Sequence, residues 1–66
     1  MTPAAVAMGL RSKYPVQAAR AKAFHRWLRW MGPFDGTRVA DARRATRLTF
    51  WTQVCHILDA EVSHVA

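Results

Sequence analysis

The chain has 66 residues, ten Lys and Arg against four Asp and Glu, and a net charge of +6. A chain of this length forms one small domain that buries only about 60% of the surface exposed when unfolded, and its single cysteine excludes a disulfide within the chain. The sequence contains neither a secretory signal nor the apolar run of about 18 residues that would span a membrane. We therefore expect a cytoplasmic protein of one domain, residues 1–66.

A short first helix is predicted at the N-terminus. Thr2 is a good N-cap residue, and Pro3 suits the first helical position. The alanine-rich stretch that follows favours a helix as far as Leu10, with Gly9 near its end. Residues 11–14 are then expected to form a basic link.

A second, amphipathic helix is predicted over residues 16–31, after Pro15 and before the Gly32-Pro33 break. Its apolar positions are Val16, Ala23, Phe24, Trp27, Leu28, Trp30 and Met31, of which we expect Trp27 to pack in the core. Its opposite face carries Lys22, His25, Arg26 and Arg29.

An uninterrupted third helix about 37 Å long is predicted over residues 38–62, since no Gly or Pro follows Gly36. Asp35 or Thr37 would cap it, and Asp41 would favour its positive end. The short connection makes the two long helices antiparallel neighbours. The predicted fold class is all-α: a three-helix unit dominated by an antiparallel hairpin, with a short N-terminal helix.

One face of the third helix changes from basic to apolar along its length. Its apolar seam, at alternating spacings of three and four, consists of Leu48, Trp51, Cys55, Leu58 and Val62. Phe50, Val54 and Ile57 widen this face beyond what one helix can cover. We expect the seam to close the core and a homodimer, with Cys55 as a small buried hydrophobe.

Basic residues supply the predicted partner-binding surface. Arg43, Arg44 and Arg47 share the face of the seam, where burying unpaired guanidinium groups would be too costly. Trp30, beside Arg26, is a candidate anchor, because Trp and Arg dominate interface hot spots. The full predicted set is Lys22, Arg26, Arg29, Trp30, Arg38, Arg43, Arg44 and Arg47.

Side chains suited to catalysis or metal binding do not cluster. Asp41, Asp59 and Glu61 project at different angles from one helix, while Cys55 and His56 point about 100° apart. The three histidines and one cysteine lack zinc-type spacing. We expect a non-enzymatic protein with no cofactor and no metal.

These patterns predict a small basic binding protein that modulates or inhibits a larger protein with an acidic surface, as short phage or mobile-element proteins do. The alternative is a DNA- or RNA-binding regulator with a helix-turn-helix-like arrangement, although the connection at residues 32–37 exceeds the usual three-to-four-residue turn. A third interpretation is binding to anionic membranes through residues 22–31. We rank it last, because the core is expected to use the same apolar face.

Overall fold

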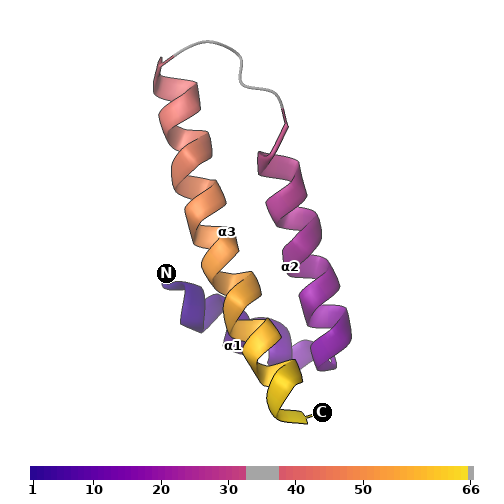
Figure 1. The fold of residues 1–66 in the computed structure, drawn as a ribbon. Helices are drawn as coiled ribbons and strands as arrows, with labels where there is room; N and C mark the ends of the chain where they lie inside the picture. Colours follow the sequence, from indigo (N-terminus) through magenta and orange to yellow (C-terminus); the bar gives the residue numbers. More distant parts are fainter. Residues whose placement is uncertain (33–37, 66) are drawn as a thin grey trace.

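Three helices make up the fold in a computed structural model of the chain. The structure describes the backbone of residues 1–32 and 38–65 and the side chains of residues 1–32 and 41–63. The helices are α1 (Pro3–Lys13), α2 (Val16–Trp30) and α3 (Arg38–Val65), and these described residues contain no strand. Helices α2 and α3 lie side by side and antiparallel, and α1 crosses behind their lower half (Figure 1). The predicted all-α hairpin with a short N-terminal helix is confirmed.

Helix α1 is longer than predicted. Its start is as expected, because the Thr2 hydroxyl accepts a hydrogen bond from the Ala5 amide at 3.2 Å and Pro3 follows the cap. The helix passes through Gly9 and ends at Lys13, so the expected end at Leu10 is wrong. A glycine inside a helix costs about 1 kcal/mol relative to alanine, which weakens a helix without ending it. The terminating signal is the proline that follows Tyr14.

The connection between α1 and α2 is set by that proline. Tyr14 has extended backbone angles, φ −135° and ψ 150°, as expected for a residue before proline. Pro15 then occupies the N-cap position of α2 without a side-chain capping bond.

At the C-terminal end of α2, the Met31 amide donates to the carbonyls of Leu28 and Trp27. Helix α2 therefore matches its prediction to within one residue.

Helix α3 runs for 28 residues and ends three residues beyond the predicted boundary. Asp41 lies in its first turn, where a carboxylate interacts favourably with the helix dipole. The predicted capping residues Asp35 and Thr37 lie outside the described residues. Thr46 and Thr49 donate their hydroxyl groups to the carbonyls four residues earlier, so these polar side chains are satisfied inside the helix.

The core lies where the three helices meet, and small side chains dominate it. Its fully buried residues are Ala7 of α1, Ala19 and Ala23 of α2, and Val54 and Leu58 of α3. Alanine at the contact lets two helix backbones approach closely, and the valine and leucine fill the space between them. The core is therefore confined to the half of the hairpin that α1 crosses.

Three residues of the predicted apolar face of α2 are on the surface. Phe24, Leu28 and Met31 keep 51%, 43% and 52% of their surface exposed. The buried side of α2 is its alanine side, because α1 and α3 cover one flank of the helix and no other element of the described residues covers the opposite flank. Ala19, which the apolar pattern did not single out, is fully buried.

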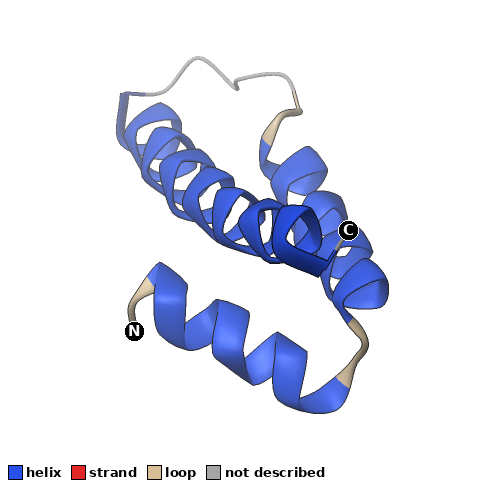
Figure 2. Cartoon of the chain, turned by 60° about the horizontal axis from the view of Figure 1, so that its bottom comes forward, coloured by secondary structure: helices blue, strands red, loops and turns tan. Residues whose placement is uncertain are grey.

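Ion pairs tie α1 and α2 to the C-terminal half of α3. The Arg11 Nε atom of α1 lies 2.9 Å from Glu61 Oε2, and the Arg20 Nε atom of α2 lies 2.7 Å from Asp59 Oδ1. Figure 2 shows α1 held across the end of the hairpin. Part-exposed pairs of this kind contribute at most about 1 kcal/mol each, so they orient helices more than they stabilise them.

Replacing Leu58 with Ala should lower the free energy of unfolding by about 3 kcal/mol, because it removes buried methyl groups and leaves a cavity. Urea denaturation followed by circular dichroism measures this loss. Met8, which is 72% exposed on α1, provides the control, and Met8→Ala should change stability by less than about 0.5 kcal/mol. Equal losses for the two variants would contradict the core assignment.

Candidate functional site

Helix α2 carries two stripes of opposite character at the same spacing. The basic stripe is Lys22, Arg26 and Arg29, and the apolar stripe is Phe24, Leu28 and Met31. Each member of one stripe is two residues from a member of the other, which is a rotation of about 200° around the helix. The stripes therefore lie on opposite flanks of α2, with the buried alanines between them on one side.

The basic stripe lines an open hollow of about 1210 Å³ bounded by all three helices. We call it the basic hollow. Its ionisable lining residues are Lys13, Tyr14, Lys22, His25, Arg26, Arg29 and Arg47. Phe50 and Trp51 of α3 and Val6 and Leu10 of α1 supply its apolar walls. None of the described residues that line it is acidic.

The positive charge of the basic hollow is not neutralised by its own lining. Asp59 and Glu61, the acidic residues of the C-terminal half of α3, are engaged by Arg20 and Arg11, which do not line the hollow. The Lys22 ammonium lies 4.6 Å from the centroid of the Tyr14 ring, a cation–π contact that fixes it at the wall. The hollow is thus a concentrated positive surface with aromatic walls.

Arg47 and Trp30 form a contact between the two long helices. The Arg47 guanidinium carbon lies 5.9 Å from the centroid of the half-buried Trp30 ring, at the outer limit of cation–π geometry. Arg47 remains exposed and also lines the basic hollow. Of the predicted partner-binding residues, the structure therefore brings Lys22, Arg26, Arg29 and Arg47 together, with Trp30 beneath Arg47.

The structure does not bring Arg43, Arg44 and Arg47 to one open surface. Arg44 is half-buried, and its Nη1 donates to the Gly32 carbonyl at 2.9 Å, which ties α3 to the end of α2. Arg43 is exposed but is not part of the hollow's lining. Arg38 begins α3, and its side chain lies outside the described part. The sequence pattern did not separate Arg44 from the other arginines, because its contact with Gly32 depends on where α2 ends in space.

The predicted seam of α3 is used inside the chain. Leu58 is fully buried, and Trp51 and Cys55 are partly buried against the core. Leu48 and Val62 are half-buried at the two ends of the seam. Val54, which was expected only to widen the seam, is the other fully buried residue of α3 among those described. The homodimer stays a prediction.

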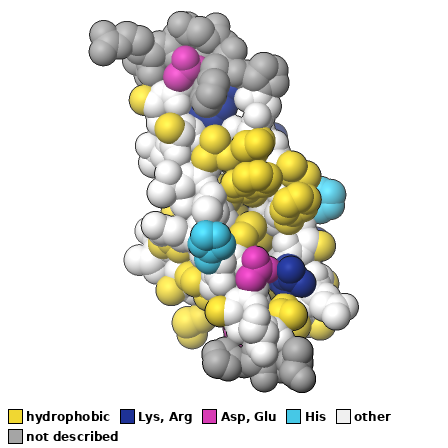
Figure 3. All heavy atoms as spheres, in the orientation of Figure 1, with side chains coloured by type: hydrophobic (Ala, Val, Ile, Leu, Met, Phe, Trp, Pro, Cys, Tyr) yellow, Lys and Arg dark blue, Asp and Glu magenta, His cyan; other side chains and the backbone are white. Residues whose placement is uncertain are grey.

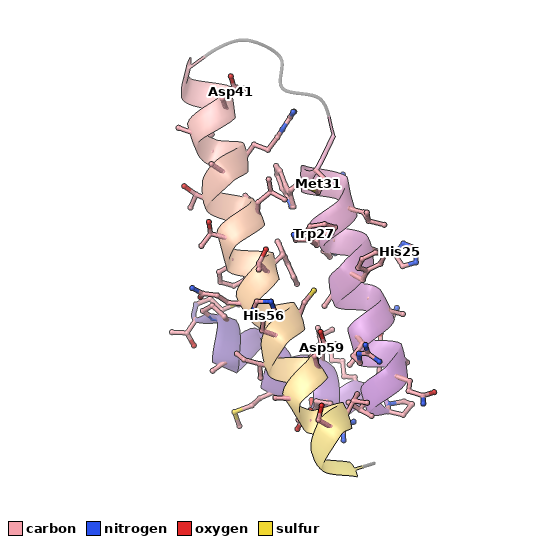
Figure 4. The ribbon with its side chains drawn as sticks, viewed as in Figure 1. His25, Trp27, Met31, Asp41, His56 and Asp59 are labelled. Carbon is pink, nitrogen blue, oxygen red and sulfur yellow. The ribbon has the colours of Figure 1, made fainter. Side chains whose placement is uncertain are left out.

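The apolar stripe occupies the face opposite α1. The Phe24 ring stacks on the half-buried Trp27 ring at a centroid distance of 5.7 Å, and the Trp27 indole donates to Thr52 Oγ1 at 3.0 Å. Figure 3 shows hydrophobic side chains gathered over α2 on this face, with few Lys and Arg side chains beside them. In Figure 4, Trp27 lies toward α3 whereas His25 points to the other side of α2. The stripe is therefore held in place by contacts across the hairpin.

Chemically reactive groups remain dispersed in the described part of the chain. Burial raises the pKa of the Cys55 thiol, the Asp59 carboxylate raises that pKa further, and the Arg20 guanidinium opposes both. His56 is exposed on α3. Among these residues no group of three His, Cys, Asp or Glu side chains is placed to hold a metal ion. Nor does any of their helices combine the length and apolarity that crossing a membrane requires.

Comparison of the chain with protein-family models, with curated proteins and with solved structures finds no match.

Replacing Arg44 with Ala should lower the free energy of unfolding by about 1 kcal/mol, because the Gly32 carbonyl loses a charged donor. The neighbouring Arg43→Ala variant removes the same charge from an exposed position and should change stability by less than about 0.5 kcal/mol. Thermal and urea unfolding of both variants measure the difference. Indistinguishable variants would show that the Arg44 contact does not hold the hairpin.

The Cys55 thiol should alkylate more slowly than a free cysteine at neutral pH, because its raised pKa keeps it protonated. The rate of reaction with iodoacetamide should rise at a higher pH than in a short cysteine peptide. The thiol of the unfolded chain loses its proton at a lower pH than the thiol of the folded chain. The free energy of unfolding is therefore unaffected at neutral pH and should fall as the pH rises from the unfolded-state pKa to the folded-state pKa of Cys55. Cys55→Ala should lose less stability in that window than the parent chain.

Proposed function

We propose that this chain is a small non-enzymatic binding protein that modulates a larger protein by stoichiometric contact with an acidic surface of that partner. The observation that carries the proposal is the basic hollow. Its lining contains Lys and Arg side chains from three helices and no acidic residue among those described. Clustered like charges raise the local potential, and an anionic partner relieves the repulsion between them.

The walls of the basic hollow favour a protein partner. Val6, Leu10 and Phe50 line it together with the cationic groups. An acidic protein segment can offer carboxylates to the arginines and apolar side chains to these walls, and Arg and aromatic residues are the usual anchors of protein interfaces. Duplex DNA is instead read by an element that projects into a groove, whereas this surface is concave.

A second candidate is binding to single-stranded nucleic acid. Tyr14 and Trp51 lie in the same hollow as the arginines, and such a combination lets bases stack while the backbone phosphates meet cations. The helix-turn-helix version of this alternative gains no support, because α2 and α3 lie side by side rather than crossing at about 90–120° (Figure 1).

Replacing Arg26 and Arg29 together with Gln should weaken binding of a labelled glutamate-rich peptide about tenfold or more, because the hollow loses two charges. Fluorescence anisotropy measures the affinity, and the affinity of the parent chain should fall as salt is added. The matched control is Arg20→Gln with Arg43→Gln, which removes two charges outside the hollow. Circular dichroism checks that both variants keep their helices.

Equal weakening by the two double variants would show that net charge, not the basic hollow, determines binding. A labelled single-stranded oligonucleotide of matched charge, tested in parallel, separates the two candidates. Tighter binding of the oligonucleotide, lost on replacing Trp51 with Leu, would favour the nucleic-acid function over the protein one.

A further inference from the structure

No element within the described residues covers the apolar stripe of α2. Phe24, Leu28 and Met31 are each about half exposed, although only five of the described residues are fully buried. Single exposed apolar residues are ordinary on protein surfaces, but three in line on one helix face form a patch. The stacked Phe24 and Trp27 rings and the indole bond to Thr52 hold that patch in a defined shape.

The charge of the chain restricts what can cover the stripe. Two copies carrying +6 each repel one another, so they can meet only through a surface poor in Lys and Arg. The basic stripe and the basic hollow occupy the other flank of α2. Arg20, which the helical rotation of about 100° per residue places on the same flank of α2 as the apolar stripe, forms a 2.7 Å pair with Asp59, and the two charges cancel each other. An acidic partner has no cationic group to meet there, whereas a second copy meets no uncompensated charge.

The spacing of the stripe is also self-complementary. In an antiparallel pair of α2 helices related by a two-fold axis between Trp27 and Leu28, Phe24 of one copy opposes Met31 of the other. Aromatic rings and the methionine thioether make favourable contacts, so the same stripe serves as both halves of an isologous interface.

We propose that the chain self-associates through the apolar stripe of α2, with a second copy of the chain as its occupant. The interface lies on α2, not on the seam of α3, because the chain's own helices cover that seam around Leu58. The patch is small compared with the interfaces of stable dimers, so the dimer is weak and forms at about 0.1–1 mM. Each basic hollow, about 200° around α2 from the stripe, faces away from the two-fold axis and stays open.

Sedimentation equilibrium of the parent chain over rising concentrations tests the proposal. The dimer fraction should increase with protein concentration and also with salt, because salt screens the repulsion between two positive chains and leaves apolar contact intact. Binding of an acidic peptide to the basic hollow changes with salt in the opposite direction. Failure of the dimer and failure of the proposed function are therefore distinguishable in the same buffers.

Leu28→Gln, at the centre of the stripe, should raise the dimer dissociation constant at least tenfold, and Met31→Gln at the end of α2 should raise it by a smaller factor. Met8→Gln on α1, which is more exposed than either, is the control and should leave the constant unchanged. Circular dichroism shows whether each variant is folded. If Leu28→Gln is unfolded, Met31→Gln still tests the proposal.

Three results would overturn the proposal. One is a parent chain that stays monomeric at the highest concentration and salt. Another is a Leu28→Gln variant that associates as strongly as the parent, because the contact would then use another face. The third is a monomeric parent that co-sediments with phosphatidylserine vesicles and loses this in Leu28→Gln, which would assign the stripe to lipid.

Discussion

The close approach of α2 and α3 at Ala19 and Ala23 is the constraint on which the other features of this small fold depend. Side chains of one carbon leave room for Val54 and Leu58, and that contact determines the rotation of α2 about its own axis. Once the alanine side faces inward, the basic stripe and the apolar stripe must emerge on opposite flanks. Helix α1 then bounds the basic hollow on one flank, and no described element covers the other flank.

Beyond the alanine contact, polar and cationic groups also join the two long helices. Trp27 donates to Thr52, Arg47 lies over Trp30, and Arg44 reaches the Gly32 carbonyl. The basic first half of α3 therefore has a structural as well as an electrostatic part. This explains how one helix face can pass from apolar to basic without burying an unpaired charge: each arginine on it either reaches a partner or remains in solvent.

The helices themselves could be predicted from sequence because their signals are local: Thr2 and Pro3 start α1, and Pro15 separates it from α2. The membership of the core was harder to predict. Hydropathy ranks Phe24 and Leu28 above Ala19, but which side of an amphipathic helix is buried depends on which neighbours exist and how closely they approach. For the site, the spacing of Lys22, Arg26 and Arg29 indicated a shared face. Whether these residues share one hollow with Arg47 depends on how α1 crosses the hairpin. The spacing of residues along a helix does not predict that crossing.

The lining of the basic hollow has a thermodynamic consequence for so short a chain. Because α1, α2 and α3 all contribute side chains to it, an occupant contacts every element of the fold at once. A ligand that binds only the assembled hollow stabilises the native state. At ligand concentrations above the dissociation constant, this stabilisation grows with the logarithm of the ratio of the two. Because only five of the described side chains are fully buried, ligand affinity and fold stability would then measure one coupled equilibrium, in which ligand release favours detachment of the N-terminal helix.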